Sequence, residues 1–345
     1  MKSDPFLRIP HEEMHHVFLS ILLQSGFGAE RAQTCAGIFT NNSMEGVYSH
    51  GVNRFFHFVD YIRKGFIQPQ AVPEQKAIAG CLEQWDGNLG PGPLNALFAS
   101  ERSMALADEH GVGMVALSRT NHWMRGGTYG WHCAGKGYAF IGWTNTIANL
   151  PPWGSAENKL GNNPLVIAVP FQNEAIVLDM AMSQFSYGKL HEMDDRQQEL
   201  PVFGGYDLSG KLTVIPGDIL RANRPLPIGY WKGSSLSLML DILAAILSGG
   251  LSTSAVTQQN KHEYGVSQVF VSVSLKKLPG YSSIQETLRQ IISDYLSAIP
   301  ESEQNTVRYP GQHLAAIRSR NMEKGIPVHP AVWSRITGLL RHSGH

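Results

Sequence analysis

A mixed α/β or α+β fold with helices at both chain ends is predicted by three observations. Apolar residues recur at helical spacing near both termini, whereas the middle of the chain alternates helical patterns with short apolar strands. No glycine pattern leaves a strand and opens a helix, as the Rossmann dinucleotide fingerprint requires. We therefore expect an α/β domain at residues 76–282 and a helical subdomain formed by residues 1–75 and 283–345.

The composition excludes several classes of protein. The 345 residues include 28 Lys plus Arg and 28 Asp plus Glu, so the formal net charge is zero with neutral histidines. The sequence therefore has no excess of positive charge of the kind that binds nucleic acid or anionic lipid. No apolar run reaches the roughly 18–20 residues of a bilayer span, so we expect a soluble, cytoplasmic protein. The three cysteines are far apart and have no Cys-x-x-Cys spacing, so structural disulfides are not expected.

The first predicted helix ends at Gly26 and contains His11, Glu12 and His15, which match the H-E-x-x-H pattern of zinc peptidases. That pattern places two metal-binding imidazoles on one helical face beside a glutamate base. Both histidines border the apolar stripe, and no third ligand stands out downstream. We therefore expect helix-edge residues and no metal, with a zinc peptidase as a remote alternative.

Two further helical patterns, at residues 29–44 and 55–64, flank the stretch Tyr48-Ser49-His50-Gly51-Val52-Asn53-Arg54. If this stretch is helical, His50 and Arg54 project from one face with their β-carbons about 5–6 Å apart. An imidazole exchanges protons near neutral pH, and a guanidinium binds a carboxylate through two hydrogen bonds. The pair suits a carbonyl next to an acid group. The alternative is a surface helix that carries an unrelated histidine and arginine.

In the middle of the chain, helices are predicted at 91–110 and 128–135, and strands at 112–117, 139–144, 165–169, 175–179 and 268–273. Residues 87–92 form a loop before the first of these helices. Residues 111–116 fit G-x-G-x-x-A in letters, but they leave a helix and open a strand, which is the wrong context for a dinucleotide.

Polar segments adjoin several of these strands. Residues 118–131 follow a strand and precede a helix, where clefts form, and there His122 or Arg125 can bind an anion. The alternative is that this loop packs into an interface and binds no ligand. Residues 144–146 and 161–164 also place amides and hydroxyls beside strands.

Two charged residues stand at element boundaries. Asp179 ends a strand and can bind a ribose hydroxyl or cap the next turn. Lys232 stands at the start of a long helix and can add its charge to the free N–H groups that favour phosphate, or it is simply solvated. Helices at 284–296, 311–324 and 331–341 complete the chain and are expected to pack on the N-terminal helices.

Five segments in the same order resemble the malate/L-lactate dehydrogenase family, which is unrelated to the Rossmann-fold lactate dehydrogenases. They are residues 48–54, 121–131, 151–154, 185–188 and 229–233. The resemblance runs nearly end to end. It implies an NAD(P)H-dependent oxidoreductase with a non-Rossmann, three-layer α/β domain that binds NAD(P), built as an intertwined homodimer with the cofactor near the subunit interface.

The resemblance also implies roles for individual residues. His50 is similar to the catalytic proton donor, and Ser49, Arg54 and His122 to residues that line the substrate pocket. The implied cofactor contacts are Ala175, Ile176, Val177, Leu178, Asp179, Met180, Ala181, Trp231, Lys232, Gly311, Gln312 and His313. Residues 161–164 and 311–313 depart from the family pattern on the cofactor side, which leaves NADH or NADPH open.

The expected reaction is hydride transfer from the C4 carbon of a reduced nicotinamide to a ketone carbon beside a carboxylate, with His50 protonating the new alkoxide. The substrate implied by the resemblance is a small 2-oxo acid, most closely a diketo sugar acid. Malate-type, lactate-type and cyclic-imine carboxylate substrates are the alternatives. A non-catalytic dimer on the same scaffold is another, and the presence of both His50 and Arg54 argues against it.

Overall fold

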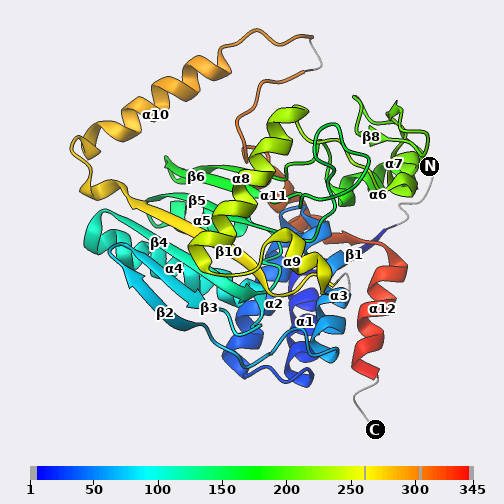
Figure 1. The fold of residues 1–345 in the computed structure, drawn as a ribbon, viewed down its shortest axis with the longest axis horizontal. Coiled ribbons are helices and arrows are strands. Elements are labelled where there is room, and N and C mark those ends of the chain that lie inside the picture. The colour runs from blue at the N-terminus through cyan, green and yellow to red at the C-terminus, as the bar shows by residue number, and fades with distance from the viewer. Residues whose placement is uncertain (1–5, 260–261, 303–304, 342–345) are drawn as a thin grey trace.

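The computed structural model describes residues 6–259, 262–302 and 305–341, and its centre is a seven-stranded sheet (Figure 1). The strand order is β2-β3-β4-β10-β5-β6-β7, and every neighbouring pair is antiparallel except β3 and β4. The strands are β2 Glu74–Ala79, β3 Leu82–Asp86, β4 Val112–Thr120, β5 Tyr138–Thr144, β6 Leu165–Phe171, β7 Glu174–Met180 and β10 Val266–Ser274. The prediction of a mixed α/β, non-Rossmann fold is confirmed.

Helices cover both faces of this sheet. Side chains alternate along β4, so Val115 and Leu117 join one apolar core, and Ala116 joins another on the opposite face. Helices α4 Gly92–His110 and α5 Gly127–Gly135 lie on the first face, and α8 Trp231–Ser248 lies on the second. The sheet domain therefore has three layers.

The boundary between α4 and β4 explains the glycines that mimic a dinucleotide motif. Gly111 ends α4 in a left-handed conformation, with φ +87°. At Gly113 an added Cβ would lie 2.2 Å from the carbonyl oxygen of Ser103, so the glycine lets β4 approach α4 closely. Gly111 therefore ends the helix and Gly113 serves packing, and the order of helix before strand is the one predicted, which does not suit a dinucleotide fingerprint.

Segments from both ends of the chain share one helical core. Strand β1 Leu7–Ile9 pairs antiparallel with β11 Ile326–Val328. Phe18, Phe39 and Phe55 pack together in this core, with ring centroids 3.9 Å apart for Phe18 and Phe55. The helices around it are α1 His11–Gln24, α2 Ala29–Met44, α3 Val52–Arg63, α11 Leu314–Lys324 and α12 Pro330–Arg341.

Helix α10 Tyr281–Leu296 lies apart from that core. Figure 1 shows it extending away from the body of the molecule, and none of its residues, all of which the structure describes, is buried. Its apolar stripe is present as predicted, but within one chain Ile284, Leu288 and Ile292 are only half-buried, near β6, and the expected packing of this helix on the N-terminal helices does not occur. The predicted boundary between domains at residue 283 stays a prediction.

A small lobe between β7 and α8 was not predicted. It contains the short elements α6 Tyr187–Asp195, β8 Gly205–Tyr206, β9 Leu212–Thr213 and α7 Pro216–Ala222. Leu190, Leu200 and Ile219 form its own apolar core. These elements are too short to give a readable periodicity, which is why the sequence did not reveal them.

Among the described residues, one helix meets the length and composition expected of a membrane span. This helix is α8, with a mean hydropathy of 1.2. Leu240 and Ala244 of α8 are buried against the sheet, and core helices pass the same test. Because α8 also carries Lys232 and Asp241, it is no continuous apolar run.

Candidate active site

The stretch around His50 is not one helix. A 3₁₀ turn, Tyr48–His50, ends at Gly51, and α3 starts at Val52. The condition under which His50 and Arg54 would share a helical face is therefore not met. An added Cβ at Gly51 would lie 2.2 Å from Oγ of Ser43, and that same oxygen accepts the Val52 N–H at 2.8 Å. The close approach to α2 forces the break.

Contacts from the neighbouring Ser49 and from α2 fix the ring and the backbone of His50. Ser49 Oγ lies 2.9 Å from His50 Nδ1, and the Asn42 side chain donates to the His50 carbonyl at 3.0 Å. Thr128 at the start of α5 in turn donates to the Asn42 carbonyl oxygen at 2.8 Å. No hydrogen bond from the described residues reaches His50 Nε2. This half-buried nitrogen is thus available to a ligand.

Burial and positive charge keep His50 neutral in the free chain. Burial first, and then the guanidinium groups of Arg54 and Arg125, lower the pKa of His50 to about 4. Arg54 also lowers the pKa values of His57 and His122. No ion pair within the described chain engages Arg54, so its charge is free to meet a carboxylate.

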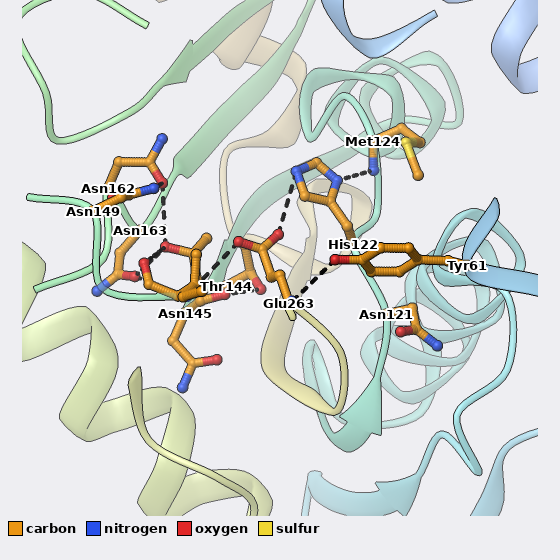
Figure 2. Close-up of polar contacts among 12 residues, drawn as sticks. Tyr61, Asn121, His122, Met124, Thr144, Asn145, Asn149, Asn162, Asn163 and Glu263 are labelled. Carbon is orange, nitrogen blue, oxygen red and sulfur yellow. Dashed lines mark hydrogen bonds and ion pairs between the residues drawn. The ribbon is translucent and has the colours of Figure 1, made fainter. Parts of the chain in front are cut away.

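His122 lies beside His50, with ring centroids 5.6 Å apart. The Met124 backbone N–H donates to His122 Nδ1 at 2.9 Å (Figure 2). A nitrogen that accepts a hydrogen bond holds no proton, so neutral His122 carries its proton on Nε2. Burial, then Arg54, His50 and His57, lower the pKa of His122 well below its usual value. His122 is therefore a neutral donor facing the site.

Glu263 is a site residue that the sequence analysis missed. Its Oε1 lies 3.9 Å from His122 Nε2, and its side chain is 13% exposed. The Ile147 backbone N–H donates to Glu263 Oε2 at 3.3 Å. The backbone N–H of Glu263 donates to Tyr61 OH at 3.2 Å (Figure 2). Burial raises the pKa of Glu263, against the opposing effect of Arg54. The one signal in the sequence is an acidic residue just before an apolar strand.

The glycine- and tryptophan-rich stretch, residues 118–131, runs from the end of β4 into α5; it contributes His122 and otherwise serves packing. Trp123 and Tyr129 are buried in the core under the sheet. Arg125 is buried and forms an ion pair with Glu45, whose other oxygen accepts from Arg318 at 3.0 Å. The suggestion that Arg125 binds an anion is therefore wrong, because Glu45 already occupies it.

The structure brings together two of the expected cofactor segments. The Val177 N–H on the edge strand β7 donates to the Pro310 carbonyl at 3.2 Å. Gly311 follows with φ +88°, and an added Cβ would lie 3.1 Å from the Trp131 ring. Gln312 and His313 continue from this contact into α11. Residues 175–181 and 311–313 thus lie side by side.

Asp179 holds the start of α5. Its Oδ2 accepts the Gly127 N–H at 2.8 Å. Burial raises the pKa of Asp179, whereas the hydrogen bond from Gly127 and the charge of Arg125 lower it. A carboxylate at a helix N-terminus is stabilised by the free N–H groups there. Asp179 therefore acts as a cap, although on a helix earlier in the chain and not on the next turn.

Trp231 and Lys232 are exposed at the start of α8. The preceding segment connects them with the end of β7, because the Ile228 N–H donates to the Met182 carbonyl at 2.8 Å. Trp153 packs near Tyr230, with ring centroids 5.2 Å apart. The expected cofactor residues at 231–232 thus lie next to the chain that leaves residue 181.

The amides beside β5 and β6 are occupied by the protein itself. Asn145 donates to Asp241 Oδ1 at 2.9 Å. Asn163 accepts the Thr146 N–H at 3.0 Å (Figure 2) and donates to the Ser237 carbonyl at 2.9 Å. The bonds to Asp241 and Ser237 tie the strand ends to α8. Most of the amides and hydroxyls in residues 144–146 and 161–164 therefore hold the protein together beside the site.

The H-E-x-x-H pattern lies on α1, away from these residues. The His11 and His15 rings stack with centroids 6.4 Å apart, and His11 Nε2 lies 3.4 Å from Asn41 Oδ1. Within the described part of the chain, no group of three or more His, Cys, Asp or Glu side chains is placed to hold a metal.

Comparisons with known proteins agree with this arrangement. The model of a family described as malate/L-lactate dehydrogenase matches residues 9–337. The chain is 43% identical over 334 residues to 2,3-diketo-L-gulonate reductase of Citrobacter koseri, covering 96% of this chain and 100% of that protein. The reductase of Klebsiella pneumoniae matches with the same identity and coverage. Malate dehydrogenase from Entamoeba histolytica has the same fold, with a TM-score of 0.91 at 19% identity over 99% of both chains.

Proposed function

The chain belongs to the malate/L-lactate dehydrogenase family of oxidoreductases, and from that premise we propose that it reduces a small 2-oxo acid. The first candidate is 2,3-diketo-L-gulonate, reduced to 3-dehydro-L-gulonate, because two relatives at 43% identity carry the name of that reductase. One observation carries the proposal. Within the described residues, His50 Nε2 has no hydrogen-bond partner, and the nearby Arg54 has no ion-pair partner.

We propose that Arg54 and His50 divide the work on the substrate. The guanidinium binds the carboxylate and orients the adjacent ketone, which contributes through positioning. His50 Nε2 gives a proton to the ketone oxygen as it becomes an alkoxide, a step worth about 10²–10⁴-fold. Ser49 holds the His50 ring through Nδ1 at 2.9 Å, and the His122 Nε2–H donates to a substrate oxygen.

A reduced nicotinamide cofactor, NADH or NADPH, supplies the hydride when it is bound. The residues proposed to hold it fit such a group. The indole N–H of Trp131 is buried without a partner among the described residues, and it lies beside Gly311 along β7. The exposed Lys232 at the start of α8 suits a phosphate. Ala175–Ala181 and Gly311–His313 form the remaining wall of this proposed site.

We propose a homodimer in the cytoplasm, with the helical subdomain and the sheet domain divided at residues 76 and 283. The dimer is supported by apolar side chains that one chain leaves uncovered. On α8 they are Trp231, Leu238, Met239, Ile242 and Ile246, and on the sheet Ile141 and Ile167. Exposed apolar side chains in this number on one helix and on the sheet beneath it favour an interface.

The deciding experiment measures oxidation of NADH and NADPH separately with 2,3-diketo-L-gulonate, pyruvate, oxaloacetate and a cyclic-imine carboxylate. We expect diketogulonate to give the highest kcat/KM, and His50→Gln to lower it by about 10²-fold or more. His16→Gln, an exposed histidine on α1, is the matched control and should keep the parent rate. A folded His50→Gln enzyme at the parent rate would overturn the proposal.

A further inference from the structure

We infer that His122 and Glu263 together bind a hydroxyl group of the substrate, and that this pair selects polyhydroxylated 2-oxo acids over plain ones. The inference rests on the proposed 2-oxo acid reduction and names a specificity determinant for it. Figure 2 shows the two side chains facing each other across the site.

The distance between the two groups suits an inserted oxygen. His122 Nε2 and Glu263 Oε1 are 3.9 Å apart, which is too long for a direct hydrogen bond. An oxygen placed to one side of the line between them can lie about 2.8 Å from both atoms. A hydroxyl matches this pair because it accepts from the His122 Nε2–H and donates to the Glu263 carboxylate.

The protein fixes the direction of each partner. His122 cannot turn its proton to Nδ1, because that atom accepts the Met124 N–H at 2.9 Å. Glu263 is held through its backbone by Tyr61 OH at 3.2 Å and through its carboxylate by the Ile147 N–H at 3.3 Å. Such preorganised partners lose little entropy when a ligand binds.

The residues on either side of Glu263 also fix its position. The Tyr264 ring stacks on Phe66 with centroids 4.6 Å apart, and the His262 ring lies 4.8 Å from the same phenylalanine. Phe66 follows α3, which carries Arg54. The acid-binding residue and the proposed hydroxyl-binding residue are therefore held by one packed unit.

Charge separates the two ends of the proposed ligand. Arg54 attracts the substrate carboxylate, whereas a second carboxylate placed against Glu263 would meet a like charge. A neutral hydroxyl meets no such repulsion. A hydroxylated monoacid therefore fits the pair, while a plain monoacid leaves His122 Nε2 and Glu263 Oε1, both half-buried, without a ligand partner.

The test compares Glu263→Gln and Glu263→Ala on two substrates, diketogulonate and pyruvate. Gln keeps one acceptor oxygen without the charge, so we expect kcat/KM for diketogulonate to fall about 10-fold, and about 100-fold for Ala. Pyruvate, which has no hydroxyl to place there, should change by less than about threefold. The exposed Glu30→Gln on α2 is the matched control, and thermal unfolding verifies that each variant folds.

Equal losses with both substrates, or no loss with diketogulonate, would overturn the inference while leaving the proposed reaction intact. A parent enzyme that reduces neither acid would overturn the proposed function instead. In that case titration calorimetry with L-gulonate and hexanoate decides the inference. Weaker L-gulonate binding in Glu263→Gln, with hexanoate unchanged, supports it, and any other result overturns it.

Discussion

The hydroxyl oxygen of Ser49 lies 2.9 Å from Nδ1 of His50, its neighbour in the chain. Two adjacent residues meet in this way because the backbone turns through a 3₁₀ segment there and not through a regular helix. The contact leaves Nε2 without a hydrogen bond from the described residues. In the proposed reaction Ser49 thus determines which edge of the ring meets the substrate, and four of the predictions below concern residues 49–54.

Removing the Ser49 hydroxyl should slow turnover without weakening substrate binding. Ser49→Ala loses one hydrogen bond to the ring, worth roughly 1 kcal/mol, so we expect kcat to fall about fivefold while KM stays near the parent value. Steady-state kinetics with diketogulonate measures both constants. A raised KM with unchanged kcat would show instead that Ser49 contacts the substrate.

The activity should decline as pH rises. His50 must carry a proton to give one, and its pKa of about 4 in the free chain means that ever less of it is protonated above that pH. A bound carboxylate offsets the charge of Arg54, so binding should raise the pKa of His50. NMR titration of His50 with and without an acid ligand tests this shift. A pKa that stays constant or falls on binding, or a kcat/KM that increases with pH, contradicts the assignment.

Arg54 should be more sensitive to substitution than its charge alone suggests. In Arg54→Lys the ammonium cannot form two parallel hydrogen bonds to a carboxylate, so we expect KM to rise about 10- to 100-fold with a smaller change in kcat. Arg63→Lys, on the exposed part of the same helix, is the control and should match the parent. Comparable kinetics for the two variants would exclude Arg54 as the acid-binding group.

Gly51 should be intolerant of even one methyl group. Its added Cβ would lie 2.2 Å from Ser43 Oγ, so Gly51→Ala should lower the free energy of unfolding by about 1–3 kcal/mol. Gly37→Ala on α2 has nothing within 4 Å of its added Cβ and should stabilise the protein by about 0.5–1 kcal/mol. Urea denaturation compares the two. A neutral Gly51→Ala would mean that the α2–α3 contact is looser than described.

A charge on the uncovered face of α8 should prevent assembly. Ile242 is 41% exposed there, and we expect Ile242→Glu to convert a dimer into monomers because a carboxylate cannot be buried unpaired. Val72→Glu, at an exposed position before β2, is the control. Analytical ultracentrifugation gives the masses. A dimeric Ile242→Glu protein would place the interface elsewhere.

Much of the sheet domain could be predicted from the sequence, because its helices and strands are long enough to show their periods. Helix α4 and strand β4 were expected at 91–110 and 112–117 and occur at Gly92–His110 and Val112–Thr120. The apolar stripe of α10 was equally readable, but its partner was not. Amphipathicity indicates that a helix needs an apolar partner, without saying whether the same chain supplies it.

The site was only partly predictable for a related reason. His50 and Arg54 are close in sequence, and the structure keeps them close although Gly51 breaks the helix between them. Glu263 is far from His122 in the chain, and their approach depends on tertiary packing around Phe66. No local spacing encodes such a contact. Arg125 was misassigned because its partner, Glu45, is also distant in sequence.

The pairing of β1 with β11 joins two segments that are far apart in the sequence, with the whole sheet domain between them. On a ribosome β1 therefore stays unpaired until β11 has emerged, and the sheet domain has time to form in between. The helices around Phe18 can close fully only afterwards. The turn that leads into α3 and carries His50 thus reaches its final position only after β11 has been made. Truncation of the last strand would be expected to damage the first helices as severely as deletion of the first strand itself.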